Sequence, residues 1–118
     1  MTTGRMRRVD EAVRQVIGDA VAELKDPRVG FVTVTDVKTS PDLRHARVYF
    51  SVLGASGGSS APQEREESLA GLRSAHGVLQ GRIAGELHLK RTPALEFVYD
   101  DTTDRAMRLE RLIEEQGS

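Results

Sequence analysis

The residues of this chain best suited to chemistry are cations and histidines that gather between Arg73 and Pro93. This segment holds four fixed cations, two histidines and one acid, in chain order Arg73, His76, Arg82, Glu86, His88, Lys90 and Arg91. Fixed cations bind phosphate oxygens strongly, and an imidazole can add a hydrogen bond. The segment therefore predicts an anion-binding surface of the kind that nucleic acids require.

A glycine lies at the centre of this segment, where Ser74-Ala75-His76-Gly77 joins two helical patterns. If the chain bends at Ala75 to Gly77, the second helix begins there, and its unpaired backbone N–H groups can face a phosphate. The predicted RNA-binding residues around this kink are Arg73, His76, Gly77, Arg82, Lys90 and Arg91. A positive φ at Gly77 would make a Gly77→Val substitution cost more than about 1 kcal/mol.

The N-terminal arginines extend the predicted RNA-binding set. Arg5, Arg7 and Arg8 precede the first acid, Asp10, and would add phosphate contacts if the first helix lies beside the basic segment.

Plainer interpretations of the same residues stay open. Gly77 can be a helix C-cap that adopts a left-handed conformation. His76 can be an ordinary surface histidine, and scattered arginines can be a solvated face. His45, Arg47 and Tyr49 alternate outward on a strand, where a solvated or tail-covered sheet face is favoured over stacking on bases.

Catalytic and metal-binding interpretations find little support. Asp100, Asp101 and Asp104 have the spacing of a strand end that passes into a helix N-terminus, where acids suit the helix dipole. The chain has no cysteine and no phosphate-loop, HExxH or GxSxG motif. We expect no catalytic residue, no metal, no cofactor and no enzymatic activity.

Hydrophobic periodicity predicts the elements that must position the basic residues. An amphipathic helix spans about 5–24, and strands cover 31–37, with an irregularity near Asp36, and about 45–53. Helices follow from about Gln63 and after Gly77, and a strand covers 94–99. A mobile Gly/Ser loop at about 54–62 and a short acidic helix at about 104–115 complete one domain of 118 residues.

This order of elements buries its apolar stripes if the helices pack on one face of a three-stranded sheet. The predicted class is therefore α+β with the type II KH-like order helix-strand-strand-helix-kink-helix-strand. KH domains clamp nucleic acid with a GXXG loop between two helices, but the sequence there is Ser74-Ala75-His76-Gly77, without the first glycine.

The chain resembles the bacterial ribosome-binding factor A family over nearly its whole length. The residues that carry the resemblance are Asp26-Pro27-Arg28, Val32-Thr33-Val34-Thr35-Asp36-Val37, Ser40-Pro41-Asp42-Leu43, Ala46-x-Val48-Tyr49, Ala75-His76-Gly77 and Pro93-x-Leu95-x-Phe97 with Asp100. In that family an Ala-x-Gly kink replaces GXXG. Two features depart from the family pattern: the Gly/Ser loop is long, and the tail is short and acidic.

The resemblance implies a cytoplasmic factor that binds free small (30S) ribosomal subunits through 16S rRNA. It also implies help in the late maturation and processing of that RNA, importance in cold adaptation, and other assembly factors as partners. From the sequence we expect a monomer without a membrane segment.

A second hypothesis is a protein-docking module without direct RNA contact. The formal net charge of −1, from 17 Lys and Arg against 18 Asp and Glu, does not by itself favour nucleic acid. The charge is nevertheless polarised, because Glu96 to Glu115 holds seven acids and three arginines.

Overall fold

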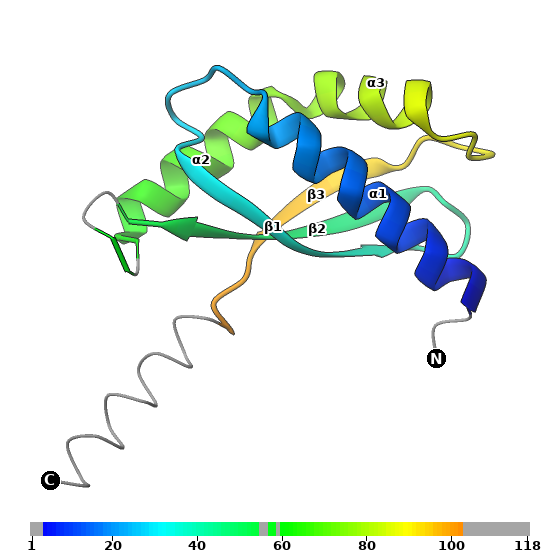
Figure 1. The fold of residues 1–118 in the computed structure, drawn as a ribbon, viewed down its shortest axis with the longest axis horizontal. Coiled ribbons are helices and arrows are strands. Elements are labelled where there is room, and N and C mark those ends of the chain that lie inside the picture. The colour runs from blue at the N-terminus through cyan, green and yellow to red at the C-terminus, as the bar shows by residue number, and fades with distance from the viewer. Residues whose placement is uncertain (1–3, 55–56, 59, 103–118) are drawn as a thin grey trace, which may run out of the picture.

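A computed structural model describes residues 4–54, 57–58 and 60–102, and it contains three helices and three strands. In chain order these are α1 (Gly4–Ala22), β1 (Phe31–Thr39), β2 (His45–Leu53), α2 (Pro62–Ser74), α3 (His76–Glu86) and β3 (Ala94–Tyr99). The helices lie on one side of the sheet, with α1 crossing in front of β3 in the view of Figure 1. This arrangement confirms the predicted α+β class and the type II KH-like order of elements. None of the described helices has the length and apolar character needed to cross a membrane.

The sheet has the strand order β1-β2-β3. β1 and β2 form an antiparallel hairpin, whereas β2 and β3 run parallel, so α2 and α3 form the crossover between them. The register of the hairpin shifts between Val34 and Asp36, which confirms the irregularity predicted near Asp36.

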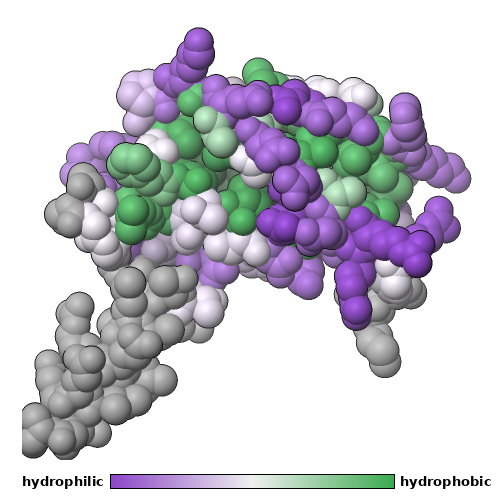
Figure 2. Space-filling view, viewed as in Figure 1, coloured by the Kyte–Doolittle hydropathy of each residue, from purple (hydrophilic) through white to green (hydrophobic). Residues whose placement is uncertain are grey.

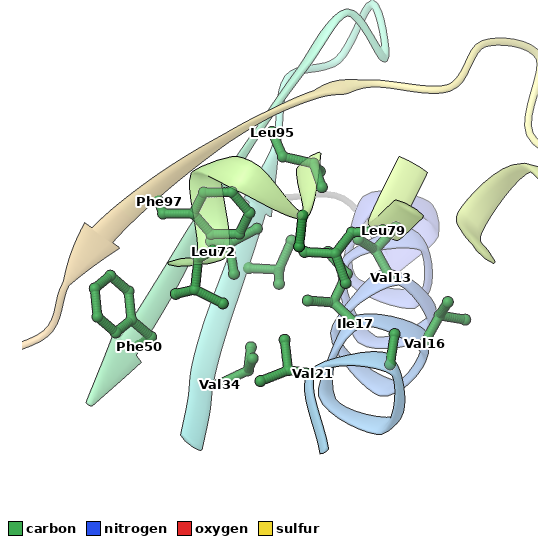
Figure 3. Close-up of a cluster of buried hydrophobic side chains, with 14 of the residues drawn as sticks. Val13, Val16, Ile17, Val21, Val34, Phe50, Leu72, Leu79, Leu95 and Phe97 are labelled. Atoms are coloured by element: carbon green, nitrogen blue, oxygen red, sulfur yellow. The ribbon is translucent and has the colours of Figure 1, made fainter. Parts of the chain in front are cut away.

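The core lies between the helical layer and one face of the sheet (Figure 3). The strict alternation of β2 buries Ala46, Val48, Phe50 and Val52, while the residues between them are exposed or half-buried. Ile17 of α1 and Leu79 and Ile83 of α3 cover this face, and all three are fully buried. The opposite face of the sheet is therefore open to solvent over the described residues.

The loop between α1 and β1 is fixed against α2. Ser68 Oγ donates a buried hydrogen bond of 2.8 Å to the carbonyl of Val29. A Cβ added at Gly71 would lie 2.8 Å from Val29 Cγ2, so only glycine fits this contact without a shift. Gly30 then opens β1 with a φ of +63°, a conformation that glycine adopts freely.

Two predicted features are only partly described. The predicted acidic helix at 104–115 lies outside the described residues. In the predicted mobile loop at 54–62, Gly54 N–H donates to the carbonyl of Gly58 at 3.0 Å, and Glu64 accepts from Ala61 N–H at 2.9 Å to begin α2. The mobility of that loop and the division into a single domain stay predictions.

Candidate nucleic-acid interface

The break between α2 and α3 lies at Ala75, which has φ −88° and ψ 4°. Gly77 lies one residue inside α3, and it is not among the described glycines with positive φ, which are Gly30, Gly57 and Gly58. A Cβ at Gly77 would meet no heavy atom within 4 Å. The interpretation that Gly77 bends the chain through a positive φ is therefore wrong, and so is its interpretation as a left-handed C-cap. Ala75, which is buried, carries the break instead.

His76 has a structural partner. Its Nε2 accepts a hydrogen bond of 3.0 Å from the backbone N–H of Leu95, at the start of β3. Because Nε2 uses its lone pair in this contact, that atom does not donate to an anion. The half-buried imidazole thus connects the α2–α3 break to the sheet, in a role that the sequence did not reveal.

Arg82 is held by two carboxylates. Its guanidinium forms an ion pair of 2.6 Å with Glu23, the residue that follows α1. It forms a second ion pair, of 2.7 Å, with Glu86 one turn further along α3. The hydrogen bonds with Glu86 and then with Glu23 raise the pKa of Arg82. Two anions around one cation cancel its attraction for a phosphate, so the structure places Arg82 in the packing of α1 against α3.

Arg73 is exposed in the last turn of α2 and makes no ion pair with any residue that the structure describes. Its charge suits the negative end of that helix dipole. Ala75 offers no side-chain cap to the first N–H groups of α3. Of the cations predicted around the kink, Arg73 alone therefore stays available next to the start of α3.

The remaining predicted cations meet at one end of the molecule, which we call the basic end and define by Arg5, Arg7, Arg8, Lys90 and Arg91. In Figure 1 the N-terminus of α1, the turn between β1 and β2, and the connection from α3 to β3 all lie at the right. Asp10 accepts a hydrogen bond of 2.8 Å from Thr39 N–H, which fixes α1 to the end of β1. The carbonyl of Arg44, in the turn, accepts from Ala94 N–H at 2.9 Å, which fixes the start of β3 to the same turn.

All five side chains of the basic end are exposed, and none forms an ion pair with a residue in the described ranges. The acids nearby are engaged with other groups. Glu11 pairs with Arg14, Asp36 pairs with Lys38, and Asp42 pairs with Arg44. Among residues 4–54, 57–58 and 60–102 the basic end therefore keeps five positive charges without ion-pair partners, although the whole chain is almost neutral.

The N-terminus of α1 is an unfavourable place for cations as far as the helix itself is concerned. Its first turn contains no acid, although acidic residues there would stabilise a helix and cations are mildly unfavourable. Local helix stability thus does not explain Arg5, Arg7 and Arg8. A phosphate bound at this end would compensate for their mutual repulsion.

The open face of the sheet offers fewer free charges. Arg47 lies 3.7 Å from Glu96, and its pKa is raised first by a hydrogen bond with Tyr49 and then by the charge of Glu96. This favours the solvated-face interpretation of His45, Arg47 and Tyr49. The described residues contain no cluster of three potential metal ligands, and Asp100 accepts a hydrogen bond from Thr35 Oγ1 at 2.8 Å. Asp104 lies outside the described residues.

Comparison with known proteins identifies the family. A sequence model described as ribosome-binding factor A matches residues 5–113. The chain belongs to the ribosome-binding factor A family. A Rubrobacter xylanophilus ribosome-binding factor A is 41% identical over 98% of this chain and 89% of its own length.

Two structures of ribosome-binding factor A proteins share the fold of this chain. A solution structure of a Thermotoga maritima protein, described as a putative ribosome-binding factor A, is 32% identical, with a TM-score of 0.70 over 83% of this chain and 89% of its own. A homology model of the Thermus thermophilus ribosome-binding factor A, fitted into a cryo-EM map of a 30S complex, is 24% identical, with a TM-score of 0.61 over 79% of this chain and 92% of its own. The second match shows the KH-like fold alone.

Proposed function

We propose that this chain associates with free small (30S) ribosomal subunits by binding 16S rRNA, and that it assists late maturation and processing of that RNA. It acts in the cytoplasm without catalysing a reaction, and its contribution is greatest in the cold. The observation that carries the proposal is the set of five cations at the basic end that have no ion-pair partner among the described residues, in a chain of the ribosome-binding factor A family.

The basic end suits a phosphate backbone better than a protein partner. Its cations come from two segments far apart in sequence, and they project from a surface whose acids already have partners. Exposed guanidinium and ammonium groups of this kind contact phosphates in a sequence-independent way and release counterions. Arg73 beside the start of α3 is a further phosphate contact in this proposal.

The 30S complex that contains the Thermus thermophilus ribosome-binding factor A adds support by analogy, since the two chains share a fold. For this protein the expected binding partner is the free small subunit. Other assembly factors bind the same particle.

The test is sedimentation of tagged full-length chain in cell extract through a sucrose gradient. We expect the protein in the fraction of free small subunits and not with translating ribosomes. A protein that stays at the top of the gradient at low salt would contradict the proposal.

The alternative, a protein-docking module without RNA contact, is distinguished by nuclease treatment. Complete RNA digestion should release the chain from the small-subunit complex if the basic end binds phosphates. A complex that survives digestion would favour the alternative.

A further inference from the structure

The end of the molecule opposite the basic end exposes two large hydrophobic side chains. Phe31, the first residue of β1, is 69% exposed, and Leu53, the last residue of β2, is 52% exposed. The two are partners in the β1–β2 ladder and form one patch. Figure 2 shows hydrophobic surface at this left end, where β1 begins and β2 ends. Adjacent exposed aromatic and aliphatic side chains are typical of interaction sites.

A groove of about 160 Å³ lies beside this patch, between the start of α2 and the ends of β1 and β2. Val52 and Ser68 lie at its base, Phe31 and Leu53 form one wall, and Glu64 and Glu67 come from α2. This volume is too small for a drug-sized ligand, whose pockets measure about 300–1,000 Å³. It suits one inserted side chain.

The base of the groove is already built in the free protein. The buried hydrogen bond from Ser68 to Val29 and the close approach of Gly71 to Val29 fix the loop against α2. A partner would therefore meet a preformed groove, which lowers the ordering cost of binding.

The charges around the groove are acidic. Glu67 lines the groove and forms no ion pair within the described part of the chain, although it accepts a hydrogen bond of 3.2 Å from Gln63 Nε2. Glu64 also lines the groove and accepts from Ala61 N–H, while Glu66 is exposed on the same turn of α2. Among the described residues that line the groove, the one cation is Arg28, which is held by Asp26 at 2.6 Å and by Ser74 Oγ at 3.0 Å. The electrostatic character of this end is thus opposite to that of the basic end.

We propose that this groove docks a basic protein segment, with one apolar side chain inserted between the Phe31–Leu53 wall and α2, and with Lys or Arg facing Glu67. RNA is disfavoured because the glutamates repel phosphates. A second copy of the chain is disfavoured because a two-fold contact would bring the same acids face to face. The proposal rests on the proposed function, since the segment belongs to a protein of the particle that the basic end binds.

The test uses the full chain with a photoreactive benzophenone amino acid in place of Leu53, mixed with purified small ribosomal subunits. A matched variant carries the same amino acid in place of Val78, which is 62% exposed on α3. Each sample is first sedimented to measure particle binding and then irradiated. We expect the Leu53 position to form an adduct with a ribosomal protein that resists nuclease, and the Val78 position to form none.

Each other outcome has one meaning. The docking proposal is overturned, and the proposed function stays intact, if the protein co-sediments but the Leu53 position forms no adduct with a ribosomal protein. That result includes an adduct with RNA, with a second copy of the chain or with residues 103–118 of the same chain, and no adduct at all. Failure of both variants to co-sediment overturns the proposed function and the docking proposal together, whereas failure of the Leu53 variant alone supports docking at this wall.

A charge reversal supplies an independent readout on the same particles. Because Glu67 is exposed, Glu67→Lys should fold normally and should lower the affinity for small subunits about 10-fold, without changing the salt dependence that the basic end generates. Asp19→Lys, on α1, is the matched control, because Asp19 is also exposed, forms no ion pair with a described residue and accepts a side-chain hydrogen bond from a glutamine one turn away. Equal affinities for the two variants would overturn the docking proposal.

Discussion

The basic end and α3 both contain side chains that the sequence predicted to bind RNA, yet those side chains differ in what they contact. On α3, Arg82 is held by Glu23 and Glu86, and His76 accepts a backbone hydrogen bond from Leu95. At the basic end, five cations have no anionic partner within the described ranges. We infer that a cation is available to bind RNA only if nearby carboxylates do not already hold it. Its presence in a basic segment of the sequence is not sufficient.

The largest effect that we expect is the loss of affinity for small subunits when the cations without ion-pair partners are replaced. Replacing cations that have such partners should cost much less affinity. Changing Arg5, Arg7, Arg8, Lys90 and Arg91 together to Gln should weaken binding to small subunits at least about 100-fold, because the counterion-release contribution of these contacts is lost. The matched control changes five paired arginines to Gln, namely Arg14, Arg28, Arg44, Arg47 and Arg82. It removes the same charge and should weaken binding only a few-fold. Equal losses in filter-binding titrations would mean that total charge alone determines affinity.

Two glycines test whether the junction is built for packing. Gly71→Val should lower the free energy of unfolding by about 1 to 3 kcal/mol more than Gly77→Val, because Val29 must move in the first case. At Gly77 the space is open and φ is not positive. Urea unfolding of both variants measures the difference. A larger loss of unfolding free energy for Gly77→Val than for Gly71→Val would support the interpretation that Gly77 bends the chain.

His76 should contribute to stability more than to binding. His76→Leu leaves the N–H of Leu95 without its acceptor, and we expect a loss of about 1 to 3 kcal/mol in the free energy of unfolding. His76→Gln, whose side-chain oxygen can accept, should recover part of that loss. A His76→Leu protein with wild-type stability and weakened RNA binding would reverse this assignment.

The smallest effect that we expect is a pH dependence of the free energy of unfolding, caused by the contact between Asp26 and Arg28 in the loop before β1. Arg28 lowers the pKa of Asp26 below its ordinary value of 3.8, first through its side-chain hydrogen bonds and then through its backbone N–H. Because the folded-state pKa is lowered, the stabilisation is present above about pH 4 and is lost as the pH falls through the folded-state pKa. Stability curves of wild type and Asp26→Asn should therefore converge in acid, and a constant separation would contradict the contact.

The sequence predicted the element order because the relevant signals are local. The alternation of β2 from His45 to Leu53 and the helical spacing of Val13, Val16 and Ile17 each report one buried face. The bulge near Asp36 was also visible as a break in alternation. These patterns depend on neighbours a few residues away, which a sequence shows directly.

The candidate site was harder to predict because its decisive contacts are distant in sequence. Glu23, which neutralises Arg82, is 59 residues away from it, and Leu95 is 19 residues away from His76. Gly77 looked like a hinge because glycine adopts a positive φ freely, yet Ala75 carries the break and the steric need for glycine falls at Gly71. The grouping of Arg5, Arg7 and Arg8 with Lys90 and Arg91 depends on how α1 crosses the sheet.

The most direct test of RNA binding through the basic end is the salt dependence of the association with small subunits. The slope of log K against log salt should fall by about 3.5 to 4.5 when the five free cations are replaced by Gln, since each lost phosphate contact removes about 0.7 to 0.9. The variant with five paired arginines replaced should keep nearly the wild-type slope. Identical slopes for wild type and the basic-end variant would contradict phosphate binding at that end.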